Sequence, residues 1–187
     1  MKRFLPLLLI GLTGCWLTVN SPNPFYTEAT RVSLPAAVGE WDLLRTNRVD
    51  QRVETDSTWI LAGTTPMKLR IYSDAGNGTG TMVFFQVTGK LYCDKLINGD
   101  AYHHLYRADL ADKQLQLAEL DGNWLTNAIA HGRVNLPAPG SNCVVNAAAS
   151  QWVAFLEHLS TNDDAFGNAI CLTRCARYNF TPARRQP

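Results

Sequence analysis

The chain has 187 residues, of which 46% are hydrophobic and 18% are charged. This length and composition predict a folded domain with its own core, and they exclude an intrinsically disordered protein. The formal net charge of +1 provides no basic excess for phosphate recognition, so we expect no nucleic-acid partner.

The first fifteen residues have the layout of an export signal. Lys2 and Arg3 precede a short apolar run, which ends in Leu12-Thr13-Gly14-Cys15. The run is too short to span a bilayer as a permanent helix. Its last four residues resemble the lipobox of bacterial lipoproteins, in which the cysteine is lipidated and becomes the first mature residue. The resemblance implies a signal peptide over residues 1–14 and lipidation of Cys15.

The same resemblance implies a location in the bacterial cell envelope. Trp16, and not Asp, follows the cysteine. In lipoproteins of enteric-type bacteria this fits passage to the outer membrane, so we expect a protein anchored there and facing the periplasm. An ordinary cleaved signal, with Cys15 lost or left free, is the alternative.

The rest of the chain divides into a tether, a domain and a tail. Residues 15–30 are rich in turn formers and show no period, as expected of a tether that carries the lipid. A single domain should occupy residues 31–178, and residues 179–187 should be a frayed tail.

The first part of the predicted domain is typical of β-strands. Leu69 and Ile71 alternate with Arg70 and Tyr72, whereas Thr81–Val87 is apolar on both faces and should be a central strand. The glycine-rich residues 74–80 between them fit a hairpin loop, because a β-branched run and not a helix follows them. A second hairpin should turn at Asp112-Lys113.

Helical periodicity begins after Leu120. Asp121 or Asn123 should cap a first helix, and Asn146 should cap a second. A third should start at Asn162 or Asp163, with Phe166 and Ile170 facing inward. In the first predicted helix the inward-facing residues are Trp124, Leu125, Ala128 and Ile129. In the second they are Trp152, Phe155, Leu156 and Leu159. The predicted class is α+β: an antiparallel, strongly curved or partly barrel-like sheet of about seven strands, with two or three C-terminal helices packed on it.

Four cysteines remain when Cys15 is assigned to lipid. An even number in an exported chain predicts two disulfides, and no histidine follows at the spacing of a zinc site. Spacing alone allows three connectivities. If the last two helices form an antiparallel pair, Cys143 meets Cys175, which leaves Cys93 for Cys171; the rival pair Cys171 and Cys175 would lie within one helical turn and strain it.

Candidate chemical groups are few. His103 and His104 should point to opposite faces of a strand, so they cannot share one metal or substrate. No Gly-x-Ser-x-Gly turn is present. We therefore expect no catalytic site, metal or cofactor. Trp41, Trp59, His104 and Tyr106 are the residues that would line a ligand cavity if the sheet encloses one.

Several segments together look like a pattern in small bacterial lipoproteins of unassigned function. They are Tyr102–Ala108, Leu115–Asp121, Trp124-Leu125 and Trp152–Leu156. Their positions are mostly apolar or turn positions, so the likeness implies a shared core. The leading hypothesis is a non-catalytic module that binds an envelope protein or protects against one. The alternatives are a carrier of a small apolar ligand and an envelope hydrolase that uses His103 or His104.

Overall fold

The computed structural model describes residues 17–46, 53–65, 68–73, 79–159 and 163–175. The expected signal peptide, Cys15 and the expected C-terminal tail lie outside these residues.

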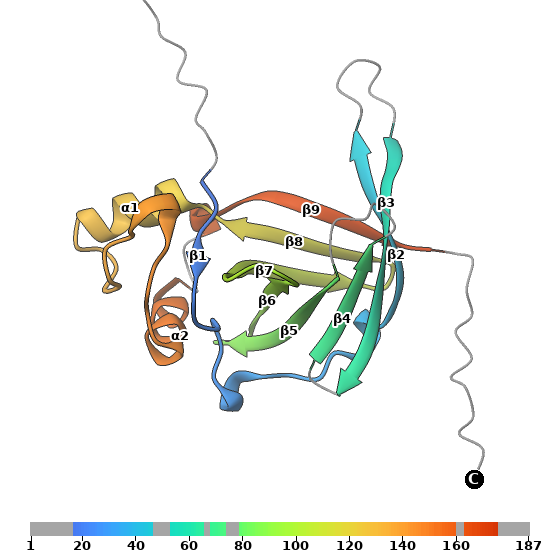
Figure 1. The fold of residues 1–187 in the computed structure, drawn as a ribbon, viewed down its shortest axis with the longest axis horizontal. Coiled ribbons are helices and arrows are strands. Elements are labelled where there is room, and N and C mark those ends of the chain that lie inside the picture. The colour runs from blue at the N-terminus through green and yellow to red at the C-terminus, as the bar shows by residue number, and fades with distance from the viewer. Residues whose placement is uncertain (1–16, 47–52, 66–67, 74–78, 160–162, 176–187) are drawn as a thin grey trace, which may run out of the picture.

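In the described part of the chain, eight strands form a closed antiparallel barrel (Figure 1). Seven of them follow one another as a meander, and the eighth, β9, lies between β8 and β2 and closes the ring. The strands are β2 (Gly39–Thr46), β3 (Val53–Thr65), β4 (Lys68–Ser73), β5 (Gly80–Val87), β6 (Lys90–Ile97), β7 (His103–Ala111), β8 (Gln114–Leu120) and β9 (Phe166–Arg174).

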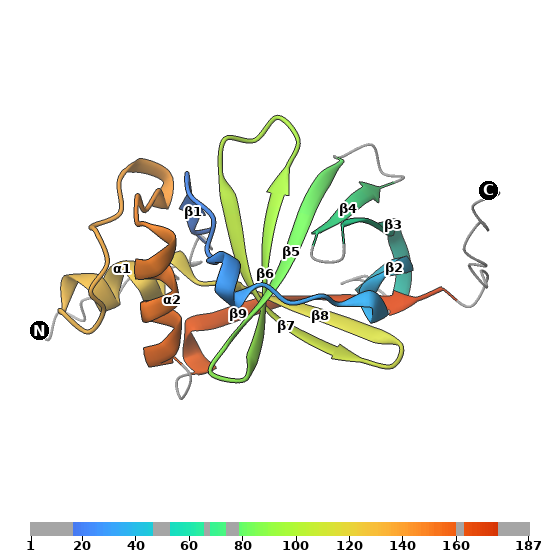
Figure 2. The ribbon, with the colours of Figure 1, turned by 90° about the horizontal axis from the view of Figure 1, so that it is seen from below.

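Two helices and one short strand accompany the barrel. Helices α1 (Gly122–Ala130) and α2 (Ala149–His158) lie between β8 and β9 in the chain, and β1 (Asn20–Ser21) pairs with β7. Figures 1 and 2 both show α1, α2 and β1 together at one side of the barrel. Short 3-10 turns lie at Glu28–Thr30, Pro35–Ala37, Ser141–Cys143 and Asp163–Ala165.

Alternation along the strands produces two cores. One side chain of each successive pair points into the barrel, and the other points out. The interior core contains Trp41, Trp59, Leu61, Leu69, Ile71, Met82, Phe84, Cys93, Tyr106, Ala108, Leu115, Leu117 and Leu172. The outer core lies between the barrel wall and the helices, and its largest members are Phe25, Phe85, Tyr92, Trp152, Phe155 and Phe166.

The predicted fold class is confirmed in its main features. The sheet is antiparallel and barrel-like, it carries two helices, and its barrel has eight strands where about seven were expected. Strand β5 is buried on both faces, as its apolar sequence predicts. The hairpin at Asp112-Lys113 is present, with Ala111 paired to Gln114. The predicted glycine-rich loop lies largely outside the described residues.

The third predicted helix is wrong, because Phe166–Arg174 is strand β9. Ile170 and Leu172 pack into the barrel interior, so the inward-facing residues repeat every two positions, as in a strand. Phe166 and Ile170 are four positions apart, which fits a helix equally well and led to the wrong prediction. Strand β9 forms ladders with both β8 and β2, which would otherwise be open edges.

The folded structure also starts earlier than predicted. Val19 and Phe25 are fully buried, and Asn20 and Ser21 pair with His104 and His103. The described residues of the expected tether are therefore part of the domain. The sequence signal was weak here because this segment has no regular period and gains its order from contacts distant in the chain.

The predicted start of α1 is confirmed, whereas the predicted start of α2 is wrong by two residues. The Asp121 side chain accepts hydrogen bonds from the backbone N–H groups of Asn123 and Trp124, as expected of a cap. Helix α2 begins after Ala148 rather than Asn146. There the Gln151 side chain accepts the backbone N–H of Ala148, and Asn146 instead accepts a bond from Asn23.

Neither expected disulfide is formed, because Cys93, Cys143 and Cys171 are free thiols. Cys93 is buried in the barrel interior, whereas Cys171 pairs with Gln116 on the outward-facing register of β9. The pairing of Cys143 with Cys175 was predicted from two adjacent antiparallel helices. The second of these helices is instead strand β9, so that argument fails. Cys143 lies instead against Gly122 at the start of α1.

Candidate functional site

The residues expected to line a ligand cavity lie largely inside the barrel. Trp41, Trp59 and Tyr106 belong to the interior core, and Trp41 donates a hydrogen bond to the carbonyl of Ala37. His104 alternates with the outward-facing His103 and is bonded to Asp100. None of these four residues lines either of the two cavities described below. The barrel interior is instead a packed core.

A few polar groups interrupt this apolar interior. The Lys95 amine lies 4.6 Å from the centre of the Trp59 ring and 5.9 Å from that of Tyr106. The Tyr106 hydroxyl donates to Glu119 over 3.4 Å. Burial lowers the pKa of Lys95, and burial together with the Glu119 charge raises the pKa of Tyr106. Burial and the adjacent Asp94 raise the pKa of the Cys93 thiol, which keeps it in its unreactive protonated form.

The two adjacent histidines each have a carboxylate partner. His103 Nδ1 lies 2.7 Å from Asp94, and His104 Nε2 lies 3.1 Å from Asp100. The bond with His104 is the main reason that the pKa of Asp100 lies below its usual value. The two pairs are separate, which agrees with the expectation that the histidines cannot act on one ligand.

The His103 pair is built into the fold. The second oxygen of Asp94 accepts the backbone N–H of Phe25, so this buried carboxylate holds the N-terminal segment against β6. Ser21, the register partner of His103, is fully buried; its hydroxyl donates to the Asn23 carbonyl and accepts from the Trp152 indole. Both hydrogen bonds use the hydroxyl of Ser21, the serine paired with His103, so this hydroxyl has a structural role.

The first cavity opens in the wall of the barrel and has a volume of about 410 Å³. The ladder between β6 and β7 ends at the pair Tyr92 and Arg107. Beyond it, Lys90 and Leu91 remain paired with β5, whereas Ala108 and Asp109 remain paired with β8. The two hairpins therefore separate, and the cavity extends from this gap across outward-facing residues of β7, β8 and β9.

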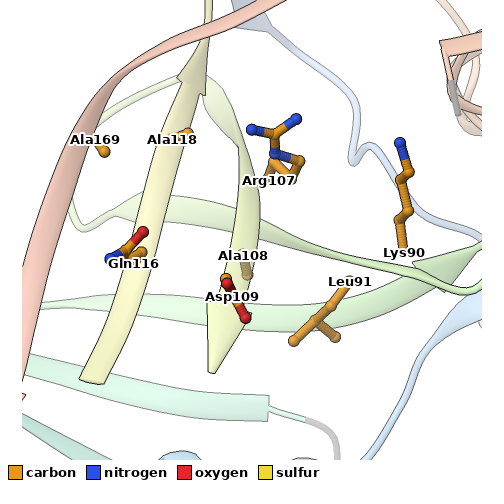
Figure 3. Close-up of a pocket in the computed structure, with 8 residues that line it drawn as sticks. All are labelled: Lys90, Leu91, Arg107, Ala108, Asp109, Gln116, Ala118 and Ala169. Atoms are coloured by element: carbon orange, nitrogen blue, oxygen red, sulfur yellow. The ribbon is translucent and has the colours of Figure 1, made fainter. Parts of the chain in front are cut away.

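Cations and polar groups line this cavity. The lining consists of Lys90, Leu91, Arg107, Ala108, Asp109, Gln116, Ala118 and Ala169. Figure 3 shows Lys90 and Arg107 extending toward the same end, with Asp109 and Gln116 toward the other. The Arg107 guanidinium lies 5.5 Å from the centre of the Phe166 ring, which restricts its position. Two cations against one carboxylate make the cavity favourable for an anionic group.

The second cavity lies between the helices and has a volume of about 490 Å³. Trp124, Val134, Phe155 and Leu159 form its apolar lining, and Arg133 and His158 are among its polar residues. The Arg133 guanidinium lies 6.0 Å from the centre of the Trp124 ring and donates to Asn127. This cavity therefore combines an aromatic surface with a cation.

Neither cavity was predicted from the sequence. Lys90, Arg107 and Gln116 alternate with apolar residues as ordinary exposed strand residues do, and no motif marks them. The first cavity depends on where two hairpins lose contact, which is a property of the assembled barrel. Trp124 and Phe155 were predicted as core residues, and both pack partly in the core and partly at the second cavity.

The described residues form neither a metal-binding cluster nor a membrane-spanning helix. No group of three His, Cys, Asp or Glu side chains lies close enough to hold a metal ion there. None of the helices in that part of the chain has both the length and the apolar character required to cross a bilayer.

No protein-family model matches this chain, and neither a curated protein nor a solved structure was found to be similar to it.

Proposed function

We propose that this chain is a bacterial lipoprotein, anchored through Cys15 in the outer membrane, that acts as a non-catalytic binding module of the cell envelope. The anchor rests on the resemblance of Leu12-Thr13-Gly14-Cys15 to a lipobox. The binding role rests on the cavity between β6 and β7. We propose that this cavity holds an anionic group, such as a carboxylate, of an envelope protein.

One observation carries the binding role: the cavity combines a break in the barrel wall with the side chains of Lys90 and Arg107. Ligand cavities in proteins usually have volumes of roughly 300 to 1,000 Å³ and contain a few convergent polar groups. The volume of about 410 Å³ fits the lower end of this range. A guanidinium can hold a carboxylate with two parallel hydrogen bonds, and a nearby amine adds attraction.

The proposal can be tested by photo-crosslinking in the intact, anchored protein. p-Benzoylphenylalanine in place of Gln116 stands at the cavity, and the same residue in place of Arg70 is the control. Arg70 is exposed on β4, four strands away from β8 around the barrel. We expect a discrete protein adduct from position 116 and none from position 70.

Substitutions that change the charge of the cavity test whether it binds an anionic group. Combining Lys90→Gln with Arg107→Gln should reduce the adduct at least tenfold, because a hydrogen bond to a charged group contributes about 1.5–3 kcal/mol. Asp109→Asn should increase the adduct, since it removes the repelling carboxylate. Lys113→Gln, on the exposed turn between β7 and β8, should change nothing. The binding role would be refuted if the adduct yield did not change with these charge substitutions, or if positions 116 and 70 gave equal yields.

A further inference from the structure

The described chain begins directly beside the helices. The Leu17 carbonyl accepts the backbone N–H of Gly122, the first residue of α1, over 2.8 Å, and Thr18 forms a bridge with Asp121. The contact is tight, because a Cβ atom at Gly122 would lie 2.4 Å from the Leu17 oxygen and 2.9 Å from the Cys143 sulfur. Leu17, the first described residue, is therefore held against the start of α1.

The position of Leu17 limits where a lipid on Cys15 can begin. Two residues of fully extended chain span at most ~7 Å. A lipid on Cys15 therefore starts within this distance of Leu17, and no long tether separates the bilayer from the domain. The end of the domain that carries α1 must lie close to the membrane surface.

The charge pattern of the segment that contains α1 and most of α2 suits a membrane surface. From Gly122 to Leu156 the chain contains neither Asp nor Glu, and Arg133 is its only Lys or Arg, although 18% of the whole chain is charged. The flanking Asp121 carboxylate is bonded to the first amides of α1, and Glu157 is the next acid along the chain. Because bilayers that contain anionic lipids repel carboxylates and attract cations, such a segment can approach the headgroups without repulsion.

The second cavity is lined mainly by residues of this same segment, together with His158 and Leu159. Its lining of Trp124, Val134, Phe155 and Leu159 suits a hydrocarbon chain, and Arg133 suits the phosphate of a headgroup. Tryptophan is also typical of the membrane interface, where one edge of its ring is apolar and the other polar.

We infer that the face formed by α1, α2 and residues Gly132–Asn135 lies on the bilayer, and that the cavity between the helices takes an acyl chain of a membrane phospholipid. The inference rests on the proposed anchor at Cys15. It adds to that proposal a defined orientation and a lipid-binding site on the domain itself.

Quenching of tryptophan fluorescence tests the inference in the lipidated full chain. The protein is reconstituted in vesicles of phosphatidylethanolamine and phosphatidylglycerol that contain a phospholipid brominated in its acyl chains. Trp16→Phe provides the background, because it removes the tryptophan next to the anchor. We expect clear quenching in this background and the loss of more than half of it when Trp124→Phe is added.

A charge variant separates the cavity from general proximity to the bilayer. Val134→Asp places a carboxylate in the cavity lining and should reduce the quenching at least twofold, whereas Gln114→Asp on the β7–β8 hairpin should not. Circular dichroism of each variant establishes that the domain is folded. Quenching that survives Trp124→Phe, or that is insensitive to Val134→Asp in folded protein, would overturn the inference.

The mass of the same preparation distinguishes the two proposals. If Cys15 is lipidated but Trp124 is not quenched, the anchor stands and the orientation is wrong. If Cys15 carries no lipid and the protein does not enter the vesicles, both the anchor and the orientation are overturned.

Discussion

Lys95 shows how one partly buried cation affects the stability of an apolar barrel. Its amine lies over Trp59 and Tyr106, and burial lowers its pKa. The attraction to an aromatic ring is worth about 0.5–1 kcal/mol when exposed and more when buried, whereas the desolvation of a charge costs several. The structure therefore predicts that the charge of Lys95 is a net cost to folding.

Replacing this lysine by an apolar residue of similar length should stabilise the protein. We expect Lys95→Met to increase the free energy of unfolding at pH 7 by about 1 kcal/mol, measured by urea denaturation. Below the lowered pKa the amine is charged in both states, so the gain is constant. Between that pKa and the ordinary value of 10.5 the unfolded wild-type chain binds more protons than the folded chain, so wild-type stability rises with pH relative to the variant.

The difference between the two proteins should therefore shrink as the pH approaches 10.5 and disappear above it. Tyr106 is present in both proteins, and burial raises its pKa in both folded states, so its contribution is common to the two pH curves. Lys113→Met, at an exposed turn, serves as the control and should show no such trend. A difference that stays constant or grows with pH would contradict a desolvated amine at Lys95.

Among the elements, the junction between the N-terminal segment and α1 has little space for an added side-chain atom. A Cβ atom on Gly122 would collide with the Leu17 backbone and the Cys143 side chain. We expect Gly122→Ala to lower the free energy of unfolding by about 1–3 kcal/mol, the usual cost of overpacking, although alanine favours helices. Chemical denaturation measures the loss.

Gly63 in β3 offers a matched control. It is exposed, and an added Cβ there meets no atom within 4 Å. Gly63→Ala should therefore change stability by less than about 0.5 kcal/mol. Equal effects of the two alanines would show that Leu17 is not held against α1.

The elements also show how far sequence reasoning reaches. Local signals predicted the central strand β5, the turn at Asp112-Lys113 and the Asp121 cap, because each depends on neighbouring residues. Strand β9 was missed because its partners, β8 and β2, are distant in the chain and decide between a strand and a helix. The order around Phe25 was missed for the same reason, since it depends on the Asp94 carboxylate and the Trp152 ring.

At the scale of the whole molecule, the inside of the barrel is a packed core, and the two cavities described above lie elsewhere. The interior is filled by its own side chains, including those of Trp41, Trp59 and Tyr106. With His104, these residues were expected to line a ligand cavity only if the sheet enclosed one, and none of the four lines either cavity described above. Both observed cavities arise where separate parts meet: two hairpins in one case, two helices in the other. Neither could be predicted from the sequence, because no local pattern records where such parts separate.

Both proposals about the whole molecule depend on one chemical event, the acylation of Cys15. The most direct test is mass spectrometry of the protein extracted from the membranes of the cells that produce it, with a Cys15→Ser variant as the control. We predict a chain that begins at Cys15 and carries acyl groups, and no such species from the variant. An unmodified chain of all 187 residues, still beginning at Met1, would contradict the account.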